Sequence, residues 1–394
     1  MNEHKDINSI NEVEDKEIIE ESKERINRNM SRFSFSMRNR LLTIREYLTF
    51  DDVMFQPNYF DGDSRSNISI KSKCSNLELN FPVMSANMKH VTGKNMAVEL
   101  AKHGGIGVLH RFQTMDEAVK EFEETILDLE ELDNVKNPKQ QVAVSIGVNQ
   151  EDKERFCLLL GAGAKIFCID IAHGHCKKMK EMLKYISDIK EQNGHQDNLT
   201  IIAGNIASAG AAQDLVNWGA DVIKVGIGPG KFCQTRENTG AGVPQLSILE
   251  EIDRLLIMNG MRDKVGVIAD GGLSKTADIA KALVYADAVM LGTMLAGTIE
   301  TPGHVFENKD GEYYKVMAGS ASAEEKTANG NDKKFVEGMT STIQFKGHVK
   351  YIFRKIYENV QSSFSYSGAQ NMEEFKKKAR FVRLTNSGIK ESKY

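Results

Sequence analysis

Residues 224–236 read KVGIGPGKFCQTR, which joins the end of a strand to a glycine-rich loop and one cysteine. The mostly apolar run 222–225 is typical of a strand buried on both faces. The glycines around Pro229 predict a loop with accessible backbone N–H and carbonyl groups, because glycine has no Cβ and tolerates unusual φ angles. Lys231 and Arg236 lie on either side of Cys233, and neighbouring positive charge favours a reactive thiolate. On these residues alone, a glycine turn that carries a buried cysteine is the commoner explanation.

Short apolar, β-rich runs alternate with helical periodicity along the chain, which is typical of βα units. The predicted strands are 82–85, 106–109, 142–146, 165–169, 200–203, 221–225, 265–269 and 288–291. Predicted helices between them include 115–129, 177–191 and 207–218. Eight such units predict an α/β protein with a (β/α)₈ (TIM) barrel, whose catalytic residues are expected at the C-terminal ends of the strands. We expect this barrel domain to span 47–394, after a charged and flexible extension at 1–46.

Polar residues follow nearly every predicted strand. The sequences at these positions are SANM (85–88), HRF (110–112), DIAHGH (170–175), AGN (203–205), ADGG (269–272) and GT (292–293). In barrels of this kind, the loops after strands 7 and 8 often bind phosphate through backbone N–H groups. Gly271, Gly272, Gly292 and Thr293 are therefore candidate phosphate ligands, and Asp270 is a candidate acceptor for ribose hydroxyls.

Composition argues against several classes of partner and environment. The net charge of −4 at pH 7 gives no broad basic field for nucleic acid. The five cysteines contain no C-x-x-C pair, which argues against a disulfide framework or a zinc site and favours a reducing cytoplasm. We see no apolar run of transmembrane length, so no membrane association is expected.

The loop GIGPGKFCQTR closely resembles the catalytic cysteine loop of the IMP dehydrogenase and GMP reductase family. The resemblance extends from about residue 48 to about residue 391. In that family the cysteine attacks C2 of a purine nucleotide. The resemblance therefore implies that Cys233 is the nucleophile and that Thr235 and Glu337 relay a proton. It also implies a flap at about 317–347 and a homotetramer.

The resemblance also implies ligands for each bound group. The implied GMP-binding residues are Asp270, Gly271, Gly272, Gly292, Thr293, Gly319, Ser320 and Ala321. The implied residues for the cofactor, NADPH, are Ser64, Arg65, Arg111, Asp170, Ile171, Ala172, Ser362, Ser363, Phe364 and Ser365. The last four match positions that reach the cofactor of a neighbouring subunit. The implied potassium ligands are the backbone carbonyls of Gly228, Gly230 and Cys233.

Four features favour GMP reductase over IMP dehydrogenase. Residues 113–141 are too few for the pair of regulatory CBS domains that most dehydrogenases insert there. The flap sequence AEEKTANGNDKKFV (323–336) lacks the Arg-Tyr pair with which the dehydrogenases activate water. GSAS (319–322), SANM and HRF resemble reductase motifs. The Ser-Arg pair in DSRS (63–66) also resembles a reductase motif, and an arginine fork suits the 2′-phosphate of NADPH.

The C-terminal sequence FVRLTNSGIKES (381–392) resembles dehydrogenases instead, and two alternatives stay open. One is an IMP dehydrogenase without CBS domains, which oxidises IMP to XMP with NAD. The other is a non-catalytic protein that binds purine nucleotides. The presence of Cys233, Thr235 and Glu337 disfavours the second alternative, because binding alone requires none of them. The expected reaction is the NADPH-dependent conversion of GMP to IMP and ammonia.

Overall fold

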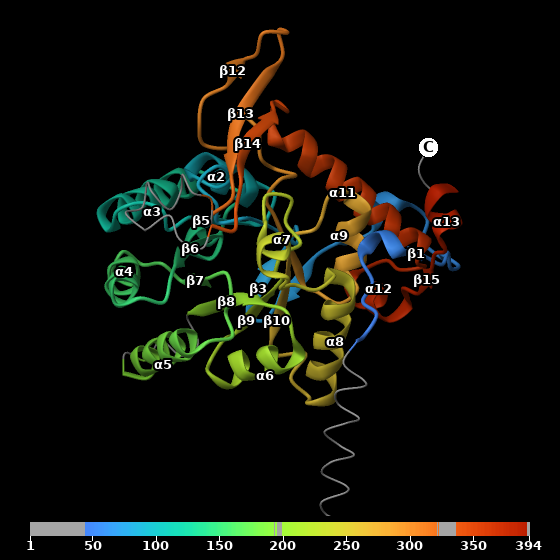
Figure 1. The fold of residues 1–394 in the computed structure, drawn as a ribbon, viewed down its shortest axis with the longest axis horizontal. Helices are drawn as coiled ribbons and strands as arrows, with labels where there is room; N and C mark the ends of the chain where they lie inside the picture. The colour runs from blue at the N-terminus through green and yellow to red at the C-terminus, as the bar shows by residue number, and fades with distance from the viewer. Residues whose placement is uncertain (1–43, 193, 195–198, 321, 323–335, 392–394) are drawn as a thin grey trace, which may run out of the picture. The chain divides into compact units, whose positions relative to one another are not determined.

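The computed structural model describes residues 44–192, 194, 199–320, 322 and 336–391. A closed, parallel, eight-stranded barrel forms the centre of the compact unit Leu48–Tyr394 (Figure 1). In barrel order the strands are β4 (Val83–Ser85), β5 (Ile106–Leu109), β6 (Val142–Ile146), β7 (Ile166–Asp170), β8 (Thr200–Ile206), β9 (Val222–Val225), β10 (Gly266–Asp270) and β11 (Ala288–Leu291). The predicted (β/α)₈ barrel is confirmed.

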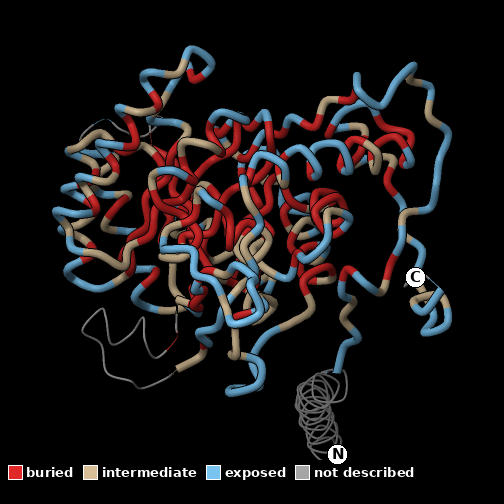
Figure 2. The backbone as a smooth tube through the Cα atoms, turned by 90° about the horizontal axis from the view of Figure 1, so that it is seen from above, coloured by how far each residue is buried: buried red, intermediate tan, exposed pale blue. Residues whose placement is uncertain are grey.

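The strand predictions agree with the structure to within one residue, except at the end of β8. That strand continues to Ile206 rather than ending at Ala203, and its register against β9 shifts between Gly204 and Ile206. Gly204 and Asn205, which were predicted to follow the strand, are therefore part of the barrel wall. The other strands match because nearly all of their residues are buried, which gives mostly apolar runs. The centre of the unit is accordingly dominated by buried residues (Figure 2).

Helices follow the strands and cover the outside of the barrel (Figure 1). They are α2 (Lys94–Lys102), α3 (Met115–Glu130), α4 (Gln150–Gly161), α5 (Lys177–Gln192), α6 (Ala209–Asn217), α8 (Gln245–Met258) and α9 (Thr276–Leu283). Helix α3 shows how the sequence specifies them. Thr114 and Glu117 form its capping box, and Phe122, Ile126 and Leu129 form its buried stripe.

The connection from β5 to β6 is short, and all of its residues are described. It contains only α3 and the 3₁₀ turn η3 (Pro138–Gln140). The expectation that no CBS domain is inserted here is therefore confirmed. The boundary of the proposed N-terminal extension stays a prediction, because residues 1–43 lie outside the described part of the chain.

Segments before and after the barrel pack together beside it. Strand β1 (Val53–Phe55) pairs antiparallel with β15 (Phe381–Arg383), and β2 (Ser72–Cys74) pairs with β3 (Leu77–Leu79). The turns η1 (Phe50–Asp52) and η2 (Arg65–Asn67) lie in the first of these segments. The C-terminal helices are α11 (Val349–Tyr366), α12 (Met372–Lys378) and α13 (Asn386–Glu391). None of the described helices is long and apolar enough to cross a membrane.

A small antiparallel sheet extends away from the barrel (orange in Figure 1). Its strands are β12 (Phe306–Glu307), β13 (Tyr313–Ala318) and β14 (Thr340–Gln344). Strands β13 and β14 lie within the predicted flap at 317–347, of which residues 321 and 323–335 lie outside the described residues. The short helix α7 (Thr235–Thr239) follows the cysteine loop.

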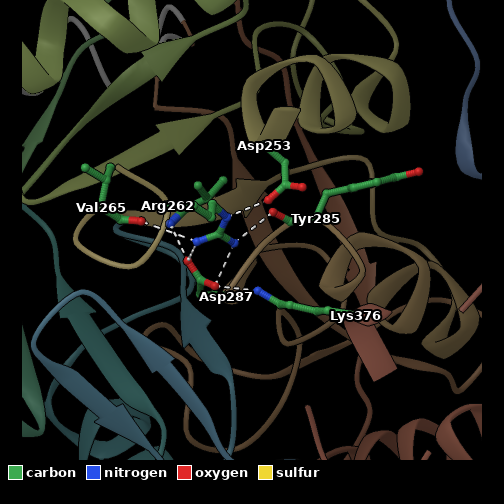
Figure 3. A network of polar contacts seen from close by, with 7 residues as sticks. Asp253, Arg262, Val265, Tyr285, Asp287 and Lys376 are labelled. Carbon is green, nitrogen blue, oxygen red and sulfur yellow. Dashed lines mark hydrogen bonds and ion pairs between the residues drawn. The ribbon is translucent and has the colours of Figure 1, made fainter. Parts of the chain in front are cut away.

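A buried ionic network at the N-terminal end of the barrel joins α12 to the barrel (Figure 3). Asp287, which is 4% exposed, accepts two hydrogen bonds from Arg262 and one from the backbone N–H of Val267. Lys376 of α12 also donates to it. Burial alone would raise the pKa of Asp287, but Lys376 and Arg262 lower it, so the carboxylate stays charged.

Replacing Asp287 by alanine should lower the free energy of unfolding by about 3–5 kcal/mol, because Arg262 and Lys376 would lose their common carboxylate in a buried position. The shift of the urea unfolding midpoint measures this effect. Asp51→Ala is the matched control, because the Asp51–Lys275 pair is 56% exposed on both sides and its loss should cost less than about 1 kcal/mol. Similar shifts of the unfolding midpoint in the two variants would show that the buried network stabilises the fold no more than the exposed pair does.

Candidate active site

A cavity of about 1850 Å³ lies at the C-terminal ends of the barrel strands. Most of the predicted site residues line it. They are Cys233, Thr235, Glu337, Asp270, Gly271, Gly272, Gly292, Thr293, Gly319, Ser320, Arg111, Asp170, Ile171, Ala172, Gly228 and Gly230. Ala321, also predicted to bind substrate, lies outside the described residues. The fold therefore gathers residues from widely separated parts of the sequence around one volume.

The cysteine loop is held in shape by its own arginine. Gly228 has φ +81°, and a Cβ built on it would lie 2.6 Å from Cγ of Arg236. The Arg236 guanidinium donates to the backbone carbonyl of Val243. Arg236, which the sequence suggested as a source of positive charge for the thiol, therefore supports the loop backbone, and the glycine leaves space for it.

Cys233, Thr235 and Glu337 form a continuous hydrogen-bonded chain. The Cys233 thiol donates to Oγ1 of Thr235 at 3.2 Å, and Thr235 Oγ1 donates to Oε2 of Glu337 at 2.6 Å. This arrangement can carry a proton between the neighbourhood of the sulfur and a carboxylate.

Backbone pairing fixes the position of Glu337. The N–H of Gln234 donates to the carbonyl of Glu337 at 2.7 Å, and the N–H of Met339 donates to the carbonyl of Phe232 at 3.2 Å. Cys233 and Gly338 face each other in this short antiparallel bridge. The segment that carries the carboxylate is thus attached to the loop that carries the thiol.

The loop after β10 packs closely against the cysteine loop. Gly271 and Gly272 have positive φ angles, and a Cβ on Gly272 would lie 2.9 Å from Cβ of Pro229. Among the described residues, none accepts a hydrogen bond from the N–H of Gly271 or Gly272. These N–H groups are suitable donors for a phosphate.

Lys346 is a cavity residue that the sequence analysis missed. Its ammonium donates to the carbonyls of Thr293 and Met294 at 2.8 and 3.1 Å, beside the loop after β11. It adds positive charge near the predicted phosphate site. A lysine in a polar segment gave no signal of its own.

Lys224 is the second missed residue, and it is among the residues that line the cavity. It is 1% exposed, and its Nζ lies 2.7 Å from Asp170 Oδ1 and 2.6 Å from Asp270 Oδ2. It also donates to the side-chain carbonyl of Asn205. The available signal was a lysine in the middle of the otherwise apolar strand Val222–Val225, where an unpaired charge would be costly.

Several predicted cofactor residues lie outside the cavity and form a separate group. Arg65 in η2 lies over the ring of Tyr366, with its guanidinium carbon 5.0 Å from the ring centroid. Gln361 of α11 donates to the carbonyl of Ile68 just beyond η2. The group comprises Ser64, Arg65, Ser362, Ser363, Phe364 and Ser365, none of which lines the cavity. Within one chain, the structure does not bring these residues to the other predicted cofactor residues.

The side chains of Phe364 and of the serines beside it have partners within the same chain. Phe364 is fully buried and stacks on Phe375 at 3.9 Å between ring centroids, so its side chain belongs to the core and has no cofactor surface. The hydroxyls of Ser362 and Ser363 donate to the carbonyls of Glu358 and Asn359. Their second lone pairs leave both serines able to accept a further hydrogen bond.

The predicted potassium ligands lie close together in the cysteine loop. Gly228 and Gly230 line the cavity, and the carbonyl of Gly230 accepts a hydrogen bond from the N–H of Cys233 at 3.0 Å. Backbone carbonyls suit a potassium ion. The donor set fits potassium chemically, although the carbonyl of Gly230 also accepts a hydrogen bond within the loop.

Comparisons with known proteins identify the family. The model of the IMP dehydrogenase / GMP reductase domain matches residues 47–394. The inosine-5′-monophosphate dehydrogenase of Cryptosporidium parvum is 32% identical over 391 residues, covering 88% of this chain and 94% of that protein. The GMP reductase of Albidiferax ferrireducens is 35% identical over 340 residues, covering 84% of this chain and 94% of that protein.

A solved structure shares the fold. It is a GMP reductase from Trypanosoma brucei in complex with guanosine 5′-monophosphate, with a TM-score of 0.79 and 28% sequence identity. The similarity covers 90% of this chain and 99% of that one. The chain therefore belongs to the IMP dehydrogenase / GMP reductase family.

Proposed function

We propose that this chain is an NADPH-dependent GMP reductase, which converts GMP to IMP and ammonia. The observation that carries the choice within the family is the flap sequence. Residues 323–336 contain neither arginine nor tyrosine, so they offer no Arg-Tyr pair to activate water for hydrolysis of a covalent intermediate. A reductase requires no such water. Relatives of both names are similar to this chain to a comparable degree, so overall similarity does not decide between them.

The proposed reaction begins when the Cys233 thiolate forms a bond to C2 of the guanine ring. The C2–N bond then breaks, and the amino group leaves as ammonia after it accepts a proton. The chain Thr235–Glu337 ends 3.2 Å from the sulfur, at the right place to supply that proton. NADPH, when bound, supplies the hydride that takes the place of the amino group at C2. Cys233 finally leaves with the electrons of the S–C2 bond, which regenerates the thiolate.

The proposed nucleotide site uses the loops after β10 and β11. Backbone N–H groups of Gly271 and Gly272 would hold the phosphate, with Lys346 nearby, and Asp270 would accept from the ribose hydroxyls. Asp170, Ile171 and Ala172 would lie beside the nicotinamide. In this proposal a potassium ion would be held by carbonyls of the cysteine loop. A homotetramer would bring Ser362 and its neighbours to the cofactor of an adjacent subunit.

The absorbance at 340 nm distinguishes the candidate functions. A GMP reductase decreases it with GMP and NADPH, whereas an IMP dehydrogenase increases it with IMP and NAD. The similarity to the Cryptosporidium dehydrogenase makes the second assay necessary. Activity only with IMP and NAD would overturn the proposal, and activity in neither assay would favour a binding protein.

Arg65→Ala should raise the Michaelis constant for NADPH about tenfold or more, with little change for NADH, because only NADPH carries a 2′-phosphate for the arginine fork. NADH is thus the control within the same variant. Steady-state kinetics with each cofactor at saturating GMP measures the difference. Equal effects on both cofactors would show that Arg65 does not recognise this phosphate and supports η2 through its contact with Tyr366.

A further inference from the structure

Lys224 lies between two carboxylates that belong to different sides of the cavity. Asp170 ends β7, next to Ile171 and Ala172, whereas Asp270 ends β10, next to the glycine loop. Both contact the same ammonium, at 2.7 and 2.6 Å. The lysine therefore connects the predicted cofactor side of the cavity to the predicted nucleotide side.

The hydrogen bonds of Lys224 are all made within the protein. An ammonium has three donors, and those of Lys224 go to Asp170, Asp270 and Asn205. Lys224 has no donor left for a ligand, so it acts only through the groups that it contacts.

Asp270 is held on one side only. Its Oδ2 accepts from both Lys224 and Asn205, and Asn205 also donates to the carbonyl of Gly226, which directly follows β9. Its Oδ1 accepts no hydrogen bond from the described residues. The carboxylate is thus attached to the protein through one oxygen, while the other stays available to a ligand.

We propose that Lys224 is a positioning residue that couples the two ligands, because a ligand that orders Asp170 also orders Asp270 through their shared ammonium. This inference rests on the proposed function, in which the cofactor contacts Asp170 and the ribose contacts Asp270. Each ligand should then bind more tightly when the other is present, and the effect must be reciprocal.

The charges around the lysine keep this connection ionised. Burial alone would raise the pKa of Asp170, but the Lys224 ammonium, with Arg111 from the end of β5, lowers it. Asn87, just after β4, also faces Asp170, and Asp270 of β10 faces the Lys224 ammonium. Burial would lower the pKa of Lys224, but Asp170 and Asp270 raise it. At neutral pH, Asp170 and Lys224 are therefore both charged.

Isothermal titration of GMP, with and without saturating NADP⁺, measures the coupling in a complex that cannot react. In the wild type, NADP⁺ should tighten GMP binding by about fivefold or more. Lys224→Met should abolish this effect, whereas Lys224→Arg, which keeps the charge and can reach both carboxylates, should retain most of it. Lys281→Met is the control for losing a buried lysine, because Lys281 donates to the carbonyl of Phe50 away from the cavity. Coupling in Lys224→Met equal to that of the wild type, or none in the wild type, would overturn the proposal.

The pH profile provides a second readout, which loss of packing alone would not change. Without the ammonium, the largest charge that opposes the effect of burial on Asp170 is gone, so the pKa of Asp170 should rise. As the pH falls through that raised pKa, kcat/KM of Lys224→Met should decline, with its acid limb at least about one pH unit above that of the wild type. Lys224→Arg should show the wild-type profile. An acid limb unchanged in Lys224→Met would count against the proposal.

A substitute variant and a substitute pair of ligands allow the coupling to be tested if Lys224→Met does not fold or if the proposed function fails. If Lys224→Met does not fold, Asp170→Asn serves instead and should lose the coupling at an NADP⁺ concentration that a separate titration shows to saturate this variant. Unchanged coupling in Asp170→Asn would contradict the proposal. If the wild type instead oxidises IMP with NAD, the same titration uses XMP and NAD⁺. The coupling is then tested even though the proposed function has failed.

Discussion

Replacing Cys233 by serine should abolish turnover while leaving GMP binding largely intact. A serine hydroxyl is a far weaker nucleophile than a thiolate near neutral pH, so the covalent step fails and kcat should fall by at least about 10³-fold. The groups proposed to hold phosphate and ribose belong to the loops after β10 and β11 and are unchanged by the substitution. The 340 nm assay measures turnover, and titration calorimetry measures GMP binding.

Cys157→Ser is the matched control for Cys233→Ser. Cys157 is exposed on α4, where its sulfur lies 3.2 Å from the hydroxyl of Tyr185, and it does not line the cavity. This control should keep wild-type turnover. Normal turnover by Cys233→Ser would exclude the covalent mechanism, and loss of GMP binding together with turnover would show that the cysteine supports the loop instead.

Glu337→Gln should separate the two halves of the reaction. Deamination requires a proton for the leaving amine, and the glutamate accepts from Thr235 at 2.6 Å at the end of the only relay that we find beside Cys233 among the described residues. Forward turnover should fall by about 10²-fold or more, the range for losing one general acid. Glutamine keeps the size of the side chain and can still hydrogen-bond to Thr235.

The reverse direction gives the decisive measurement for Glu337→Gln. Hydride transfer from IMP to NADP⁺ needs no protonated amine, so stopped flow should still show a burst of NADPH comparable to that of the wild type. Glu312→Gln is the control, because Glu312 precedes β13 outside the cavity and contacts Tyr314 and Asn308. Disappearance of the burst along with turnover would show that Glu337 acts in the hydride step or in folding, and the relay would be wrong.

Local patterns predicted the barrel well because each strand is buried on both faces and each helix on one. Burial of this kind produces continuous apolar runs and helical periodicity that can be read without knowing the fold. The end of β8 was missed because Asn205 is polar, although it is satisfied inside the barrel by Lys224, Asp270 and Gly226. A single sequence does not show which distant partners will satisfy a buried polar group.

The resemblance supplied the pair Thr235 and Glu337, which local patterns could not, because the two residues are 102 positions apart and their hydrogen bond exists only because residues 337–339 pair with the cysteine loop. The role of Lys224 cannot be predicted from its own strand, because its two carboxylates come from β7 and β10. Arg65 and its neighbours stay a prediction, because one chain does not bring them to the cavity.

The pairing of β1 with β15 has a consequence for how the protein is made. Val53 lies opposite Arg383. Strand β1 therefore cannot pair until β15, near the other end of the unit, has been synthesised. Likewise, Arg262 is the only cation of the network beside Asp287 until Lys376 has been synthesised. A nascent chain that stops before α12 would expose the edge of β1 and lack one cation of the buried network. Such incomplete chains are typical substrates of chaperones, so this unit reaches its final form only when nearly all of it has left the ribosome.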